Sequence, residues 1–247
     1  MCKSGTNGKS AQIFVLVHGA WHGGWCWEEI EPRLRQLGYQ TVAPDLPGHG
    51  ENTEPLAEQT LDSYAEAIVR VLDKMPEPVI LVGHSMGGPV ATMAAERRPE
   101  KVKKLVYMAA FLLKPGQSVN GLDNGIRPID LVGRSQNGKT APWSAEQIKR
   151  FSVDCTGEDI TRICQRLCEE AIAPLTTGVH PTRERWGSIR RFYIACTDDM
   201  AATPESVEEM LANNPCEDVY SLKADHLAFY SAPDELTAIL DDIACKL

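Results

Sequence analysis

A serine between two glycines occupies the segment of this chain best suited to chemistry. Residues 83–87 read Gly-His-Ser-Met-Gly, with an apolar run at 79–82 before them and a helix-forming run after them. The pattern G-x-S-x-G between a strand and a helix is typical of a sharp turn that lifts a serine hydroxyl above a sheet. The glycines leave room for the turn, and the helix begins with unpaired N–H groups that favour negative charge. Ser85 is therefore the candidate nucleophile.

A serine hydroxyl needs a histidine base, and the base needs a carboxylate that orients it. Of the six histidines, His226 lies between the last predicted strand and the C-terminal helix, as the chain order serine, acid, histidine requires. The loop after the preceding strand supplies Asp198 and Asp199. Asp199 is favoured because its neighbour can face solvent or cap the next helix. Asp225 adjoins His226, but adjacent side chains of an extended loop point in different directions.

Attack by the serine on a carbonyl carbon creates an oxyanion, which two N–H donors must stabilise. The backbone N–H of Met86, directly after the nucleophile, is one candidate. The backbone N–H of Ala20, in the loop after the first strand, is the other, because Gly19 lets the main chain bend there. Neither side chain takes part in the chemistry, so both positions should matter only through shape.

Strands and helices alternate along the chain, which predicts an α/β protein with a parallel sheet covered on both faces. The first apolar run, at 13–17, is rich in β-branched residues, as expected of a strand buried on both faces. The other predicted strands lie at 41–43, 79–82, 105–109, 192–196 and 219–222, and the predicted helices lie at 27–37, 61–74, 86–97, 205–212 and 234–247.

The alternation breaks between residues 111 and 190, where helix-like pieces at 144–152 and 158–171 interrupt segments rich in Gly and Pro. Because this stretch falls between two predicted strands, we expect a cap inserted above the sheet. The predicted organisation is a flexible tail at 1–10, a core formed by 11–110 and 191–247, and a cap at 111–190.

Composition narrows the class of protein. At 247 residues the chain can bury a sizeable core, and a net charge of −9 argues against nucleic acid or an anionic membrane surface as the main partner. The N-terminus lacks the apolar core of a secretory signal, which favours a cytoplasmic protein. The eight cysteines form no C-x-x-C pair, so no zinc site is expected. A homodimer is compatible with the sequence.

Five segments together strongly resemble the methyl esterase and hydroxynitrile lyase family of α/β-hydrolases. They are residues 18–27, 44–46, 83–88, 196–199 and 224–226, and the resemblance covers the sheet nearly end to end but is weak in the cap. It implies an α/β-hydrolase fold: a mainly parallel sheet flanked by helices, with a helical cap inserted after the sixth strand region.

The resemblance also implies a reaction. It assigns acyl transfer to Ser85, His226 and Asp199, with Ala20 and Met86 as oxyanion donors and with no metal or organic cofactor. The expected function is hydrolysis of a small-molecule carboxylic ester through an acyl-enzyme. The residues that follow Asp45-Leu46, Pro-Gly-His-Gly, differ from the plant-type esterases, which leaves the substrate preference open.

Two positions separate the esterases from the lyases of this family. The lyase branch has a Thr after the first-strand His and a Lys after the catalytic His, whereas this chain has Gly19 and Leu227. Without that hydroxyl and that cation, a cyanide leaving group would lack stabilisation, so an esterase is favoured. A non-catalytic small-molecule binding protein of the same fold is the other alternative.

Further residues are given lesser roles. Four side chains can line a substrate pocket or belong to the core: Trp21, Phe111, Trp143 and Leu227. His49, in its Pro-Gly-His-Gly turn, is interpreted as fixing a loop rather than as a catalyst. His22 is expected to hydrogen-bond the backbone beneath the oxyanion loop.

Overall fold

Six parallel strands form the sheet that positions the candidate site. The computed structural model describes residues 12–122 and 137–247. The strand order is β2-β1-β3-β4-β7-β8, and every neighbouring pair is parallel. The strands are β1 (Ile13–Val17), β2 (Gln40–Val42), β3 (Val79–His84), β4 (Val102–Met108), β7 (Arg190–Cys196) and β8 (Asp218–Leu222).

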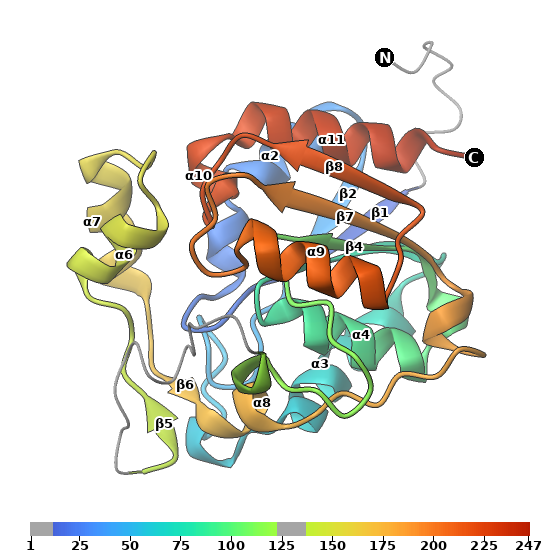
Figure 1. The fold of residues 1–247 in the computed structure, drawn as a ribbon, viewed down its shortest axis with the longest axis horizontal. Helices are drawn as coiled ribbons and strands as arrows, with labels where there is room; N and C mark the ends of the chain where they lie inside the picture. Colours follow the sequence, from blue (N-terminus) through green and yellow to red (C-terminus); the bar gives the residue numbers. More distant parts are fainter. Residues whose placement is uncertain (1–11, 123–136) are drawn as a thin grey trace.

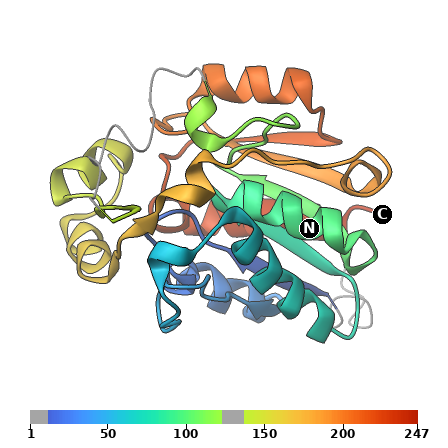
Figure 2. The same ribbon diagram turned by 90° about the horizontal axis from the view of Figure 1, so that it is seen from below.

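Helices cover both faces of this sheet, as expected for a parallel sheet whose strands are joined by crossover helices. Figure 1 shows α2 and α11 on one face, and α3, α4 and α9 on the other, the face nearer the viewer in Figure 2. These helices are α2 (Ile30–Gln36), α3 (Leu61–Lys74), α4 (Gly87–Arg97), α9 (Pro204–Asn213) and α11 (Pro233–Cys245).

The register of the central strands brings their carboxyl ends to one edge. Val17 of β1 pairs with Gly83 of β3, and Gly83 pairs with Tyr107 of β4. Every residue of β1 and β3 is buried, because β1 and residues 79–82 of β3 are apolar and helices cover both faces of the sheet. Loops that leave these strand ends therefore meet above a rigid, fully packed layer.

The insertion predicted above the sheet begins after β4. It contains β5 (Lys139–Thr140), α6 (Ala145–Phe151), α7 (Gly157–Arg166), β6 (Glu170–Ala171) and α8 (Ile172–Thr176), and β5 and β6 pair antiparallel. Figure 1 shows α6 and α7 beyond the carboxyl ends of the strands. Only four strands of the described chain precede the insertion, so its expected place after a sixth strand was wrong as a count.

The predicted helix at 158–171 was too long. Helix α7 ends at Arg166, and Leu167 is extended. The chain leaves the helix because the Cys168 N–H bonds to the Trp21 carbonyl (3.0 Å) and residues 170–171 pair with β5. The predicted tail at 1–10 lies outside the described residues, and the division into core and cap stays a prediction.

Short helices complete the described chain. Single turns of 3₁₀ helix occur at Gly24–Trp27, Leu56–Glu58, Pro99–Lys101, Val119–Gly121 and Trp186–Ser188, and α10 spans Ala228–Ser231. The predicted helix at 27–37 is thus a 3₁₀ turn followed by α2.

Candidate active site

Ser85 lies in the turn between β3 and α4. Its φ is +52°, in the left-handed region that non-glycine residues rarely adopt, and its side chain is nearly buried. A Cβ on Gly83 would lie 2.5 Å from the Gly87 carbonyl oxygen, and a Cβ on Gly87 would lie 2.7 Å from the oxygens of Val17 and His18. Both glycines are therefore required by close approach of backbone to backbone.

A continuous chain of hydrogen bonds joins Ser85 to a carboxylate. His226 Nδ1 lies 2.9 Å from Asp199 Oδ2, and His226 Nε2 lies 3.0 Å from Ser85 Oγ. A carboxylate only accepts, so Nδ1 carries the proton and Nε2 accepts from the serine hydroxyl. Asp199 follows β7 and His226 follows β8, so adjacent strands position acid and base. His226 and Asp199 are both buried.

The three aspartates near the histidine occupy different environments. Asp199 Oδ1 accepts the N–H groups of residues 201 and 202 at 2.7 and 2.9 Å, which leaves Oδ2 directed at the imidazole. Asp198 is exposed. The carboxylate of Asp225 is buried but accepts from Leu227 N, Ser231 Oγ and Asp154 N, so it fixes the loop around His226. Burial raises the pKa of Asp225, and these hydrogen bonds offset part of that increase.

The two predicted oxyanion donors lie on the turns that flank Ser85. Met86 precedes the first residue of α4, and Ala20 lies two residues after His18, beyond the end of β1. Among the described residues, neither backbone N–H has a hydrogen-bond acceptor. A Cβ on Gly19 would lie 2.8 Å from Ser85 Cβ, so the Ala20 turn passes directly beside the nucleophile.

Three further histidines are packed behind the triad in neutral form. His84 Nε2 donates to the His226 carbonyl (2.9 Å), His22 Nδ1 donates to the Ala20 carbonyl (2.8 Å), and His18 Nε2 accepts from Leu46 N (3.0 Å). Burial lowers the pKa of each, to about 4 for His22 and well below the usual value for His18 and His84. The bond predicted between His22 and the backbone is present. The contact of His84 with the His226 carbonyl was not predicted.

Of the four predicted pocket residues, Trp143 and Phe111 lie beside the triad, and Trp21 packs against Trp143. The ring of Trp143 is 6.2 Å from that of His226, stacks on Phe151 at 4.5 Å, and lies 5.0 Å from Trp21. Phe111 donates its N–H to the Ser85 carbonyl at 3.2 Å. The Leu227 side chain is fully buried, in contact with the core. Whether these residues bind substrate stays a prediction.

A buried carboxylate in the insertion was missed entirely. Glu170 is fully buried and lies 3.0 Å from His49 Nε2, while the Tyr64 hydroxyl and the Trp21 N–H donate to it at 2.7 and 3.2 Å. His49 does lie in a fixed loop, as interpreted from the sequence. The sequence around Glu170, which holds His49, contains no pattern that predicts this contact. No motif surrounds Glu170, and its partner lies 121 residues away.

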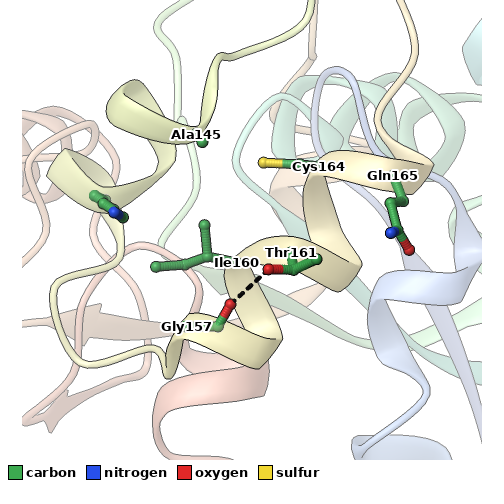
Figure 3. Close-up of a pocket in the computed structure, with 7 residues that line it drawn as sticks. Ala145, Gly157, Ile160, Thr161, Cys164 and Gln165 are labelled. Atoms are coloured by element: carbon green, nitrogen blue, oxygen red, sulfur yellow. Dashed lines mark hydrogen bonds between the residues drawn. The ribbon is translucent and has the colours of Figure 1, made fainter.

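A separate hollow of about 400 Å³ lies on the insertion between α6 and α7. Figure 3 shows residues that line it, among them Ile160, Thr161 and Cys164 of α7. None of its lining residues is one of the predicted site residues.

The described residues contain neither a metal-binding cluster nor a membrane-spanning helix. No group of three or more His, Cys, Asp or Glu side chains within 12–122 and 137–247 is arranged to hold a metal ion. In that part of the chain, no helix has the length and apolar character needed to cross a membrane.

Comparison with known proteins agrees with this arrangement. A model of the alpha/beta hydrolase family matches residues 14–239. The chain is 32% identical to putative methylesterase 14, chloroplastic, from Arabidopsis thaliana, over 94% of this chain and 71% of that protein. It is 30% identical to methylesterase 7 from Arabidopsis thaliana, over 94% of this chain and 96% of that protein.

Solved structures of similar proteins share the fold. A methylesterase from Arabidopsis superposes with a TM-score of 0.82 at 26% identity, over 96% of this chain and 100% of that one. Polyneuridine aldehyde esterase superposes with a TM-score of 0.82 at 25% identity, over 94% of this chain and 99% of that one. The predicted fold is confirmed, and the chain belongs to the alpha/beta hydrolase family.

Proposed function

We propose that this protein is a serine carboxylic ester hydrolase that acts on small-molecule esters through an acyl-enzyme. The observation that carries the proposal is the chain of two hydrogen bonds from Asp199 through His226 to Ser85, at 2.9 and 3.0 Å. Such a chain activates a serine hydroxyl for attack on a carbonyl carbon. The esterase names of the related proteins support the same reaction.

Acylation begins as Ser85 Oγ attacks the ester carbonyl carbon while its proton passes to His226 Nε2. The new imidazolium is stabilised by Asp199, and the oxyanion accepts from the N–H groups of Ala20 and Met86. The bond from the carbonyl carbon to the alcohol oxygen then breaks, and His226 returns the proton to the leaving alcohol. The products of this half-reaction are the free alcohol and an acyl group on Ser85.

Deacylation repeats the steps with water. His226 takes a proton from the water molecule, whose oxygen attacks the acyl carbon, and the same two N–H groups hold the second oxyanion. The bond to Ser85 Oγ breaks, His226 returns the proton to it, and a carboxylic acid leaves. No step requires a metal or an organic cofactor.

Gly19 and Leu227, the two positions that distinguish the lyases of this family, do not favour a hydroxynitrile lyase. A Cβ at Gly19 would lie 2.8 Å from Ser85 Cβ, so a threonine there would displace the turn. Leu227 is fully buried, and a lysine in its place would bring an uncompensated charge into the core. Cyanide release from mandelonitrile is accordingly expected to be absent.

Relatives named methylesterase make methyl esters the first substrates to test. The net charge of −9 supports a site that serves small molecules rather than nucleic acid. A location in the cytoplasm and a homodimeric state remain predictions from the sequence.

The test compares the wild type with Ser85→Ala on p-nitrophenyl esters of increasing chain length and on methyl esters. We expect the substitution to lower kcat by at least about 10³-fold, because the nucleophile is lost. Circular dichroism of both proteins provides the control for folding. Equal turnover by both would overturn the proposal, and saturable ligand binding with no turnover dependent on Ser85 would favour a binding protein of this fold.

A further inference from the structure

Glu170 connects the insertion to the turn that holds one oxyanion donor. Its carboxylate accepts from Trp21 N at 3.2 Å, Tyr64 Oη at 2.7 Å, His49 Nε2 at 3.0 Å and its neighbour Ala171 N at 2.9 Å. These donors come from the loop after β1, from α3, from the loop after β2 and from β6 itself. A fully buried carboxylate with every oxygen engaged is fixed in place.

The peptide bonds on both sides of Ala20 are held by side chains. On one side, the Gly19 carbonyl accepts from His18 Nδ1 at 2.8 Å. On the other, the Ala20 carbonyl accepts from His22 Nδ1 at 2.8 Å, and the Trp21 N–H of the same planar peptide donates to Glu170. The Ala20 N–H lies in the first of these planes, and the second plane, which Glu170 holds, is joined to it at the Ala20 Cα, so Glu170 acts on its direction through the adjacent peptide.

The backbone of this turn needs such support. Trp21 has a φ of +64°, a conformation that is strained for a residue with a bulky side chain. The insertion holds Trp21 at further points, since the Trp21 carbonyl accepts from Cys168 N at 3.0 Å and its indole donates to Thr140 Oγ1 at 2.8 Å. Residues of the insertion thus impose the conformation that the turn alone would not adopt.

His49 supplies the charge that balances Glu170. Its Nε2 faces the Glu170 carboxylate, and its Nδ1 faces the Pro47 carbonyl at 3.2 Å. Both partners only accept, so both ring nitrogens donate and the imidazole is protonated. The other titratable groups that face it are Cys168, Tyr64 and His18. Burial is the largest single influence and lowers the pKa of His49, but the charge of Glu170 and the hydrogen bonds to Glu170 and Cys168 together outweigh it and raise this pKa to about 11.

We propose that Glu170 is a positioning residue of the oxyanion hole: it holds the Trp21 amide so that the Ala20 N–H points at the developing oxyanion, and protonated His49 keeps its charge compensated. The inference rests on the proposed function. It makes part of the insertion a component of the catalytic machinery.

The test is Glu170→Gln, with Glu28→Gln as its matched control. Glu28 makes a second contact between core and insertion, with Arg162 and Arg166 of α7, and it also accepts from Tyr230 of α10; none of these residues belongs to the turn at 19–22. Full removal of one oxyanion donor costs about 10²–10³-fold in kcat, so we expect misplacement in Glu170→Gln to cost roughly 10–100-fold with KM nearly unchanged. Glu28→Gln is expected to keep kcat within about twofold of the wild type, as for a surface ion pair.

A second readout separates positioning from stability. Phenylboronic acid forms a tetrahedral adduct with a serine hydroxyl and places an oxygen in the oxyanion position. Its affinity should fall in Glu170→Gln by the same factor as kcat and stay unchanged in Glu28→Gln. The double variant His49→Gln/Glu170→Gln removes both charges together and so leaves no unpaired buried charge. If the single variant does not fold, the same measurements are made on the double variant.

The outcomes are distinct. Wild-type kcat and boronate affinity in a folded Glu170→Gln or double variant would overturn the inference while leaving the esterase intact. An equal loss in Glu28→Gln would overturn it as well, since the effect would then belong to any contact of the insertion. Absence of turnover in the wild type would overturn the proposed function, and this inference with it.

Discussion

Two buried carboxylate–histidine pairs lie in different regions of this protein and differ in the group that faces the second nitrogen of the imidazole. Asp199 and His226 follow β7 and β8, whereas Glu170 belongs to the insertion and His49 to the loop after β2. Both carboxylates are buried, both contact an imidazole nitrogen at about the same distance, 2.9 and 3.0 Å, and both accept backbone N–H groups.

The two histidines differ in the group that faces the second ring nitrogen, the one that does not contact the carboxylate. The second nitrogen of His226 meets a hydroxyl, which can donate a hydrogen bond, so this nitrogen can act as an acceptor. The second nitrogen of His49 meets a carbonyl, which can only accept, so the ring is a fixed cation. The same type of pair is thus compatible with the proposed base at His226 and with a counter-ion at His49, because the group that faces the second nitrogen differs.

The largest expected effects come from replacement of the two histidines, His226 and His49. His226→Gln is expected to lower kcat by about 10⁶-fold, because the base is lost. His49→Gln keeps the triad, and we expect a loss of at most roughly 100-fold, as for an impaired oxyanion donor. It leaves the charge of Glu170 unpaired, which should lower the free energy of unfolding by about 3–5 kcal/mol.

Single-turnover kinetics and urea unfolding of both histidine variants provide these values. If His49→Gln abolished activity as completely as His226→Gln while remaining folded, His49 would belong to the chemistry and the distinction between base and counter-ion would fail.

The adjacent aspartates after β7 test the acid of the triad. Asp199→Asn should lower kcat by about 10⁴-fold, because an amide can stabilise the wrong tautomer of the imidazole. The exposed Asp198, changed to Asn, should leave kcat within about twofold of the wild type, as for an isolated surface substitution. Steady-state kinetics on one ester suffices, and similar losses in the two variants would contradict the choice of Asp199.

The smallest expected effect is on the pH dependence of stability. The pKa of His49 is raised to about 11 from an unfolded value near 6.5, so its contribution is fully present below pH 6.5 and declines as pH rises toward 11. For His18, His22 and His84 the pKa is lowered, so their contribution is present above 6.5 and is lost as pH falls, toward about 4 for His22. Stability should therefore be greatest near neutral pH.

Urea unfolding of the wild type and His49→Gln between pH 4 and pH 10 isolates the His49 contribution. The difference in unfolding free energy between the two should shrink as pH rises above neutral. Parallel curves over the alkaline range would show that His49 is neutral in the folded protein.

The arrangement of Ser85, His226 and Asp199 in the candidate active site could be predicted from the sequence, because its signals are local or follow chain order. Ser85 is identified by glycines two residues away on either side, and these glycines are required by backbone contacts that a side chain would obstruct. Asp199 and His226 could be placed because parallel strands bring their carboxyl ends to one edge.

The insertion could not be predicted in the same way. Residues 158–171 have a helical pattern, yet α7 ends at Arg166 because the backbone beyond it bonds to Trp21 and to β5. Glutamate is a residue type usually found at the surface, and Glu170 meets His49 and Tyr64 only in the folded chain. Tertiary contacts between distant segments decided both features, and local propensity carries no information about them.

The pairing of β5 with β6 marks where the insertion could be cut for protein engineering. New substrate preferences in proteins of this kind can be sought by transplanting the helical part of the insertion from a relative onto this sheet. Residues 168–171, although they follow α7, carry the Cys168 and Glu170 contacts to Trp21. A graft that stops between α7 and β6 keeps the recipient's own contacts from residues 168 and 170 to Trp21, whereas one that runs through to α8 replaces them.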